Sequence, residues 1–204
     1  CKMKKETIVV ASSNKGKISE IKEIFKDYDV LSIKDMENIL GKKITVNENN
    51  DTYKDNALEK VRDLYEQIGK KYICIADDSG ISIDILNGFP GVHTARWLDA
   101  DDHIKNLELL KKVGNTVKEK RKCHYTTVIA LKSKNFEETF EYVLSGVVSD
   151  AARGENGFGF DEIFELSNGK TLAEISTIEK LKLSPRKEAL DMANRYLMKF
   201  KTEN

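Results

Sequence analysis

The sequence predicts an α/β protein in which a long mixed β-sheet is flanked by helices. Short apolar runs typical of strands alternate along the chain with segments whose apolar residues recur at helical spacing. Two longer strand-like segments, 125–131 and 140–148, are separated only by the polar segment 132–138, which predicts an antiparallel portion beside a parallel one. We expect a single domain over residues 1–204, because the sequence has two prolines and no repeat or clear linker.

The start of the chain predicts a strand, a polar turn and a helix. Ile8 to Ala11 is an apolar run typical of a buried strand, and the polar residues after it can cap a helix. Helical spacing is then marked by Ile18, Ile21, Ile24 and Phe25. Residues 30–33 indicate a second strand, whereas the polar segment 34–51 gives no clear element and ends in a loop.

A second helix and a strand are predicted to follow. Thr52 with Asp55 resembles a capping box, and an apolar face continues to a stop near Gly69. The strand 72–76 is predicted to end at the polar residues 77–80. Alternating isoleucines at 81, 83 and 85 then indicate a separate strand or hairpin arm, and 87–91 is a loop.

The second half of the chain contains two further predicted helices. Ile104, Leu107, Leu110 and Val113 indicate the first of them. A glycine-rich loop covers 154–159. Ser184 and Pro185 suit the cap and first position of the last helix. Its predicted buried face consists of Ala189, Ala193, Tyr196, Leu197 and Phe200.

Composition and charge exclude several classes of protein. Lys plus Arg and Asp plus Glu are 34 each, so the formal net charge is zero, which argues against a nucleic-acid partner. The longest run without charged residues, Ile85 to Ala95, falls short of the roughly 20 residues of a membrane span. The first residues lead into a strand rather than a secretory signal. We therefore expect neither a nucleic-acid nor a membrane partner.

The cysteines indicate a reducing compartment. Cys1, Cys74 and Cys123 are widely spaced and form no CxxC pair, which fits buried thiols better than a disulfide framework or a zinc site. The sequence therefore predicts a cytoplasmic protein. Its three histidines are separated and match no metal spacing or catalytic triad.

The first candidate site is the polar turn between the opening strand and helix. Backbone N–H groups at a helix N-terminus attract anions, and a lysine one turn in adds positive charge. The turn is not a Walker A motif, because Ile18 follows where Ser or Thr is needed. A plain capped helix with a solvated basic turn is the alternative. The residues concerned are Ser12, Ser13, Asn14, Lys15, Gly16 and Lys17.

The second candidate is the acidic pair Asp77-Asp78 at a strand end. Two adjacent carboxylates cannot both be buried without a cation or solvent, and their oxygens suit Mg²⁺. The alternative is a turn in which the carboxylates cap backbone amides. Glu48 is a candidate third ligand and Lys60 a candidate phosphate contact, although both residue types are common on ordinary surfaces.

Two segments near the C-terminal end are further candidates. Glycines flank Phe158, so the backbone can approach a ligand while the ring stacks on it, but Glu162 excludes a dinucleotide fingerprint. Core aromatic packing is the alternative. Lys180 and Arg186 near the last helix start would suit a bound anion or carbonyl oxygen, or a merely solvated helix start.

Together these segments resemble the inosine triphosphate pyrophosphatase family, also called Ham1-like. Each match is weak by itself, but six in the family's order over nearly the whole chain are a strong signal. The matching segments are 9–17, 55–60, 75–81, 88–96, 157–164 and 184–186.

The resemblance implies hydrolysis of ITP, dITP and XTP to the monophosphate and pyrophosphate, by metal-assisted attack of water at the α-phosphorus. It also implies Mg²⁺ as the cofactor, with Mn²⁺ as a substitute. The implied fold is two-lobed, with a long mixed sheet and a substrate cleft between the lobes, and the implied assembly is a homodimer.

The resemblance also assigns roles to residues. Asp78 matches the general base and a metal-linked carboxylate, Glu48 matches a metal ligand, and Asp77 belongs to the metal site. Phosphate-binding positions are Ser12 to Lys17, Lys60 and Lys180. The remaining substrate-binding positions are Ser79, Arg96, Phe158, Gly159, Phe160, Asp161, Ser184 and Arg186.

Two departures from the family pattern bear on specificity. Pro185 stands where the family usually has His, and Pro has neither a side-chain donor nor a backbone N–H. Ser12-Ser13 replaces the family's Thr-Gly. The alternatives are therefore a pyrophosphatase of broader base preference, such as the Maf-like group, and a nucleotide-binding module without turnover.

Overall fold

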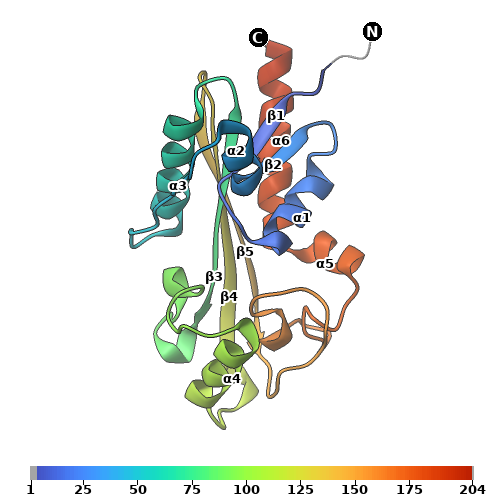
Figure 1. Ribbon diagram of the computed structural model, residues 1–204. Coiled ribbons are helices and arrows are strands. Elements are labelled where there is room, and N and C mark those ends of the chain that lie inside the picture. Colours follow the sequence, from blue (N-terminus) through green and yellow to red (C-terminus); the bar gives the residue numbers. More distant parts are fainter. Residues whose placement is uncertain (1–3, 204) are drawn as a thin grey trace. The chain divides into compact units, whose positions relative to one another are not determined.

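The computed structural model describes residues 4–203 and shows a six-stranded sheet with helices (Figure 1). The strands are β1 Thr7–Val10, β2 Asp29–Ser32, β3 Ile73–Ile83, β4 Lys122–Lys132, β5 Glu137–Val148 and β6 Phe164–Glu165. The helices are α1 Lys15–Ile24, α2 Ile33–Leu40, α3 Tyr53–Ile68, α4 Asp102–Val113, α5 Thr177–Leu183 and α6 Pro185–Glu203.

The sheet is mixed, which confirms the predicted α/β class. Its strand order is β2-β1-β3-β4-β5-β6. β1 pairs in parallel with β2 and with β3, and β5 pairs antiparallel with β6. Only residues 133–136 join β4 to its neighbour β5, so these two strands form an antiparallel hairpin.

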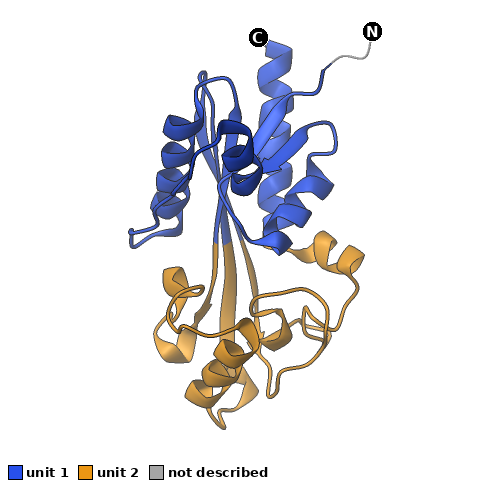
Figure 2. Cartoon of the chain, viewed as in Figure 1, with its two compact units in different colours: residues 1–78, 127–142, 186–204 blue, residues 79–126, 143–185 orange. Residues whose placement is uncertain are grey.

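The chain divides into two compact units, each built from separate stretches of sequence (Figure 2). The first comprises residues 1–78, 127–142 and 186–204, and the second comprises 79–126 and 143–185. β3, β4 and β5 each contribute residues to both units. The prediction of a single domain and the prediction of a cleft both stay predictions.

The first unit has a core on each face of its strands, because successive strand side chains point to opposite faces. Ile8 and Val10 of β1 pack with α1 and α6, whereas Val9 and Ala11 pack with α2 and α3. The buried face predicted for α6 is confirmed for four of its five residues: Ala189, Ala193 and Leu197 are core residues, and Tyr196 packs against them, whereas Phe200 is partly buried and outside this core.

The second unit has a core of its own. Ile81 and Ile83 of β3 and Tyr125 of β4 pack against Phe160 and Phe164. The rings of Tyr125 and Phe160 meet edge to face, with their centroids 4.8 Å apart. This core supports the segment that follows the glycine-rich loop.

The structure differs from the sequence-based expectations at three places. Residues 33–40 form α2, whose Ser32–Asp35 capping box was overlooked because the segment is polar. β3 runs unbroken through Asp77 and Asp78, where the strand 72–76 was predicted to end, and it includes Ile81 and Ile83, which were predicted to lie in a separate strand or hairpin arm. The helix predicted from Ile104, Leu107, Leu110 and Val113 is confirmed as α4, but its buried residues are Asn106, Leu109 and Val113, whereas Ile104 and Leu107 are exposed.

Two of the three cysteines lie among the described residues, whereas Cys1 lies outside them. Cys74 and Cys123 are buried free thiols. Burial raises the pKa of Cys74 to about 12, so it is not a reactive thiolate. Among residues 4–203, no helix is long and apolar enough to cross a membrane.

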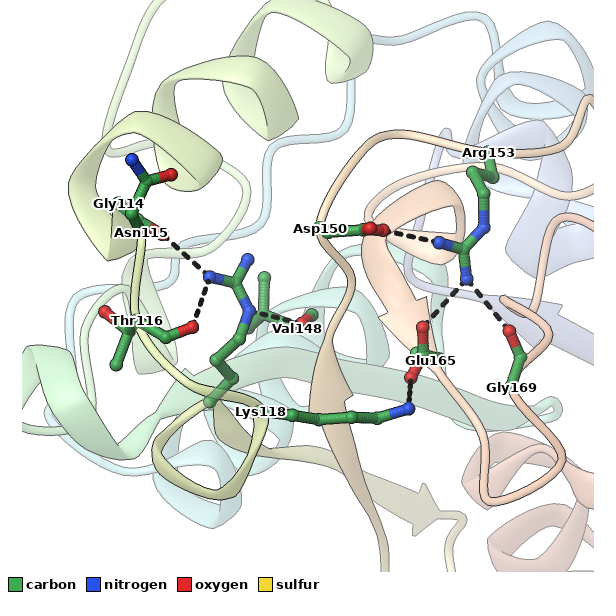
Figure 3. A pocket seen from close by; sticks show the side chains of 10 residues that line it. Gly114, Asn115, Thr116, Lys118, Val148, Asp150, Arg153, Glu165 and Gly169 are labelled. Atoms are coloured by element: carbon green, nitrogen blue, oxygen red, sulfur yellow. Dashed lines mark hydrogen bonds and ion pairs between the residues drawn. The ribbon is translucent and has the colours of Figure 1, made fainter.

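A buried arginine ties together the polar backbone around the end of α4. Arg121 donates from Nε to Val148 O at 2.8 Å, from Nη1 to Gly114 O at 2.8 Å and from Nη2 to Ser149 O at 2.6 Å. It borders a cavity of about 460 Å³ whose other lining includes Lys118, drawn in Figure 3. These carbonyls would lose their partners without the guanidinium.

We expect Arg121→Ala to lower the free energy of unfolding by about 3 kcal/mol, because the carbonyl oxygens of the buried residues Val148 and Ser149 lose a charged donor. Urea unfolding followed by circular dichroism measures the change. Lys122→Ala, at an exposed neighbouring position, is the matched control and should change stability by less than about 0.5 kcal/mol. Equal effects of the two substitutions would contradict the structural role of Arg121.

Candidate active site

Asp77 of β3 is fully buried and carries an ion pair on each carboxylate oxygen. Lys17 Nζ of α1 lies 2.6 Å from Oδ1, and Arg186 Nε of α6 lies 2.8 Å from Oδ2. Burial by itself would raise the pKa of Asp77, but the charges of Arg186 and Lys17 outweigh it and hold the pKa below its ordinary value. Asp77 is therefore an ionised structural centre at neutral pH.

Glu20 completes this buried network. Arg186 is only 2% exposed, and its Nη1 donates to both carboxylate oxygens of Glu20, at 3.2 and 3.1 Å. Glu20 and Lys17 are three residues apart on α1, so both reach the network from one helix face. Glu20 was not predicted as a site residue, although it lies beside the apolar residue Ile21, which is also buried.

The turn before α1 is held by its own polar side chains. Ser12 Oγ accepts a hydrogen bond from the backbone N–H of Asn14, and Asn14 Oδ1 accepts one from that of Lys17, both at 3.0 Å. Ser13, Asn14 and Lys15 are exposed, whereas Gly16 is partly buried. The first turn of α1 contains no acidic residue, so the helix start suits an anion.

Lys60 of α3 gathers three oxygen groups. Its Nζ lies 2.6 Å from Glu48 Oε1, 2.5 Å from Asp77 O and 3.6 Å from Asp78 Oδ1. Lys60 is itself buried, at 7% exposed. This one cation brings the predicted residues Glu48 and Asp78 together.

Asp78 is the carboxylate with unmet bonding capacity. Its Oδ2 is buried and has no hydrogen-bond partner among the described residues. Burial raises the pKa of Asp78 from 3.8 to about 7; Lys60 opposes this shift, and the neighbouring Glu48 adds to it. Two close carboxylates and an unpartnered oxygen are the chemistry that a hard divalent cation satisfies.

A cation here would depend on ligands beyond the protein. Among residues 4–203, no three His, Cys, Asp or Glu side chains gather as a ready metal site. Glu48 and Asp78 would therefore supply part of the coordination, as is usual for Mg²⁺, which keeps waters and takes phosphate oxygens. The oxygens of Asp77 are engaged by Lys17 and Arg186, so the predicted metal contact of Asp77 gains no support from the geometry.

A second cluster forms at the glycine-rich loop, within the other unit. Lys180 Nζ of α5 lies 2.6 Å from Asp161 Oδ2 and 4.2 Å from the ring centroid of Phe158. Asp161 Oδ2 also accepts from the backbone N–H of Phe158 at 3.0 Å. A Cβ on Gly157, whose φ is +76°, would lie 2.1 Å from that oxygen, so only glycine fits.

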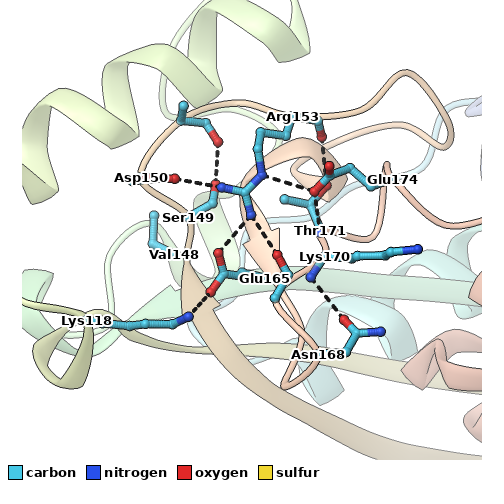
Figure 4. A network of polar contacts seen from close by, with 12 residues as sticks. Lys118, Val148, Ser149, Asp150, Arg153, Glu165, Asn168, Lys170, Thr171 and Glu174 are labelled. Carbon is cyan, nitrogen blue, oxygen red and sulfur yellow. Dashed lines mark hydrogen bonds and ion pairs between the residues drawn. The ribbon is translucent and has the colours of Figure 1, made fainter.

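Arg153 anchors the start of this loop, as Figure 4 shows. Its guanidinium pairs with Asp150 at 2.6 Å, Glu165 at 2.8 Å and Glu174 at 3.0 Å. The second oxygen of Glu165 pairs with Lys118 at 2.6 Å. Because the cations are paired internally, this network fixes the loop and is a poor candidate for binding an anion.

The remaining predicted residues are placed as follows. Phe160 is a core residue, which favours the alternative of aromatic packing for that position. Ser184 is fully buried and caps the C-terminal end of α5, donating its backbone N–H to Lys180 O. Ser79 is partly buried in β3, and Arg96 is exposed in the turn after residue 93.

The Ham1 family model matches residues 8–196, which is most of the chain. This chain belongs to the Ham1 family. A dITP/XTP pyrophosphatase of Thermoanaerobacter sp. (strain X514) is 42% identical over 197 residues, covering 94% of this chain and 96% of that protein. One from Staphylococcus aureus (strain MRSA252) is 36% identical, covering 93% and 95%.

Solved structures of Ham1 proteins agree with the fold. The Staphylococcus aureus Ham1 protein superimposes with a TM-score of 0.82 and 34% identity, covering 95% of this chain and 98% of that chain. A Coxiella burnetii HAM1 protein gives the same TM-score at 29% identity, covering 95% and 99%. The family predicted from six short motifs is therefore confirmed over almost the full length.

We expect Asp78→Asn to stabilise the metal-free protein at pH 8. Between pH 4 and 7 the folded state binds the Asp78 proton more tightly than the unfolded state, so wild-type stability falls as pH rises through this window. Asn carries no charge to bury. The free energy of unfolding of Asp78→Asn should therefore exceed that of the wild type by nearly zero at pH 4 and by about 2 kcal/mol above pH 7.

Urea unfolding in EDTA at several pH values measures this gain. Asp51→Asn, in an exposed loop position, is the control for loss of a carboxylate elsewhere in the chain. A gain for Asp78→Asn that is the same at pH 4 and pH 8 would show that Asp78 has an ordinary pKa.

Proposed function

We propose that this protein hydrolyses the non-standard purine nucleoside triphosphates ITP, dITP and XTP to the monophosphate and pyrophosphate. The observation that carries the proposal is the contrast between the neighbours Asp77 and Asp78. The first is neutralised by two cations, whereas the second has an unpartnered oxygen and a pKa near neutrality. The names of the relatives, dITP/XTP pyrophosphatases, point to the same reaction.

We assign the triphosphate to the cationic and acidic residues of the first unit. The N-terminus of α1 offers backbone N–H groups, and Lys17 and Lys60 offer charge beside Asp77 and Asp78. Glu48 and Asp78 would hold Mg²⁺, or Mn²⁺ in its place. The bound ion would neutralise charge developing on the phosphates. The protein's contribution is to orient the phosphates toward the acidic pair.

Asp78 is the proposed general base. A base works best when its pKa lies near the working pH, and burial brings the pKa of Asp78 to about 7. Its Oδ2 would accept a proton from the attacking water as the oxygen approaches the α-phosphorus. Lys60, 3.6 Å from Oδ1, would hold the carboxylate in place and stabilise the ionised form that the step requires.

We assign the base to the cluster around Phe158. The half-buried ring would stack on the purine, and the Lys180 contact with Phe158 supports a place for Lys180 on the base side of the substrate. A 6-oxo group accepts from such a donor, whereas a 6-amino group would leave it unpaired. The burial of Arg186 against Asp77 and Glu20 supports a structural role for Arg186.

A broader base preference is the second candidate. Pro185 provides no donor where the family usually has His, and this favours looser discrimination. In line with the family resemblance, we also propose that the protein is cytoplasmic and forms a homodimer. Each chain would act as one catalytic domain.

The direct test is pyrophosphate release from ITP, XTP, dITP, GTP, ATP and a pyrimidine triphosphate, with Mg²⁺ and with EDTA. We expect ITP and XTP to exceed ATP in kcat/KM by about 100-fold or more and EDTA to abolish release. Asp78→Asn, which should fold, is expected to lower kcat by about 1000-fold. Similar rates for all bases would favour the second candidate, and no release from any would contradict the proposal.

A further inference from the structure

Gly159, the residue after Phe158, has both of its backbone polar groups bound by side chains of α4. Its N–H donates to Asp102 Oδ2 at 2.9 Å. Its carbonyl oxygen accepts from Asn106 Nδ2, also at 2.9 Å. Asp102 and Asn106 are four residues apart, so one face of α4 binds the peptide groups on both sides of Gly159.

Asn106 is a buried polar residue, and its side-chain amide group is engaged in binding the loop. It is 2% exposed, on a helix face otherwise buried through Leu109 and Val113. Its second amide hydrogen points to Glu162 Oε1, at 3.0 Å, an oxygen that also contacts His103 Nδ1 at 2.7 Å. Replacing a buried amide that donates both of its hydrogens leaves buried acceptors without a partner, which costs stability. Asn106 has no role in the proposed phosphate chemistry.

The loop needs an external clamp because its own backbone is permissive. Gly154, Gly157 and Gly159 all have positive φ, and glycine loses more conformational freedom on ordering than any other residue. Asp161 holds Phe158 by its backbone N–H. The α4 contacts hold the next residue, so the ring of Phe158 lies between two fixed points.

We propose that Asn106, assisted by Asp102, is a positioning residue that orders the Phe158–Gly159 segment before substrate binds. The inference rests on the proposed function, in which Phe158 receives the purine. Without the α4 contacts the Phe158–Gly159 segment is less ordered before nucleotide binds, so the cost of ordering it appears in affinity. The chemistry at Asp78 is untouched in the bound complex, so kcat is maintained.

The first test is kinetic. We expect Asn106→Asp, which is isosteric but lacks both donors, to raise KM for ITP about tenfold, and Asp102→Ala to raise it about threefold, with kcat within about twofold of wild type. Asp102→Asn retains an acceptor oxygen for Gly159 N–H and should restore the wild-type KM. Lys111→Ala, on the exposed face of α4, is the control for changes in the helix itself.

The second test needs no nucleotide. Hydrogen exchange should accelerate about tenfold for the amides of residues 157–160 in Asn106→Asp and in Asp102→Ala, and stay unchanged in Asp102→Asn. If both Asn106→Asp and Asp102→Ala fold and their amide exchange rates at residues 157–160 equal those of the wild type, the inference is overturned. A lower kcat at constant KM would also overturn it. Failure of the wild-type protein to cleave ITP would overturn the proposed function instead, since the exchange result stands without it.

Discussion

Asp77 is a carboxylate buried completely inside the first unit, and it can stay ionised there only because Lys17 and Arg186 each pair with one of its oxygens. The three residues come from α1, β3 and α6, which are far apart in sequence. Removing either cation would leave an uncompensated buried charge, which typically costs about 3–5 kcal/mol. The ion pairs therefore link the positions of these elements to one another.

Asp77 and Asp78 are neighbours in β3 but have different chemistry. Neighbouring residues of a strand point to opposite sides, so the two carboxylates experience different surroundings. Asp77 faces two cations, whereas Asp78 meets Lys60 and the like charge of Glu48. Two adjacent acids thus differ in pKa by environment alone, one suited to structure and the other to proton transfer and cation binding.

The sequence predicted well what depends on local pattern. The opening strand and helix, the Thr52 cap of α3 and the start of α6 at Pro185 follow from periodicity and capping. Local sequence pattern gave wrong element boundaries where contacts with remote residues determine the structure. β3 continues through Asp77 because remote cations compensate the buried charge, and no local signal reports Lys17 or Arg186 as its partners.

In the candidate site, too, some residues could be predicted from the sequence and others could not. Asp78, Glu48 and Lys60 were predicted from motifs, and the structure brings them together around one ammonium group. Asn106 was missed because the predicted apolar face of α4 ran through Ile104 and Leu107, which are exposed. A polar side chain that binds another segment's backbone leaves no periodic trace.

The pKa values of Asp77 and Asp78 are shifted in opposite directions from the ordinary value of an aspartate. Carboxyl carbon NMR of the metal-free protein with labelled aspartate, assigned with Asp77→Asn and Asp78→Asn, measures both pKa values directly. We expect Asp77 to stay ionised well below the pH range in which an aspartate ordinarily titrates, and Asp78 to titrate at about pH 7. Titration of Asp78 near 4, or of Asp77 above Asp78, would contradict it.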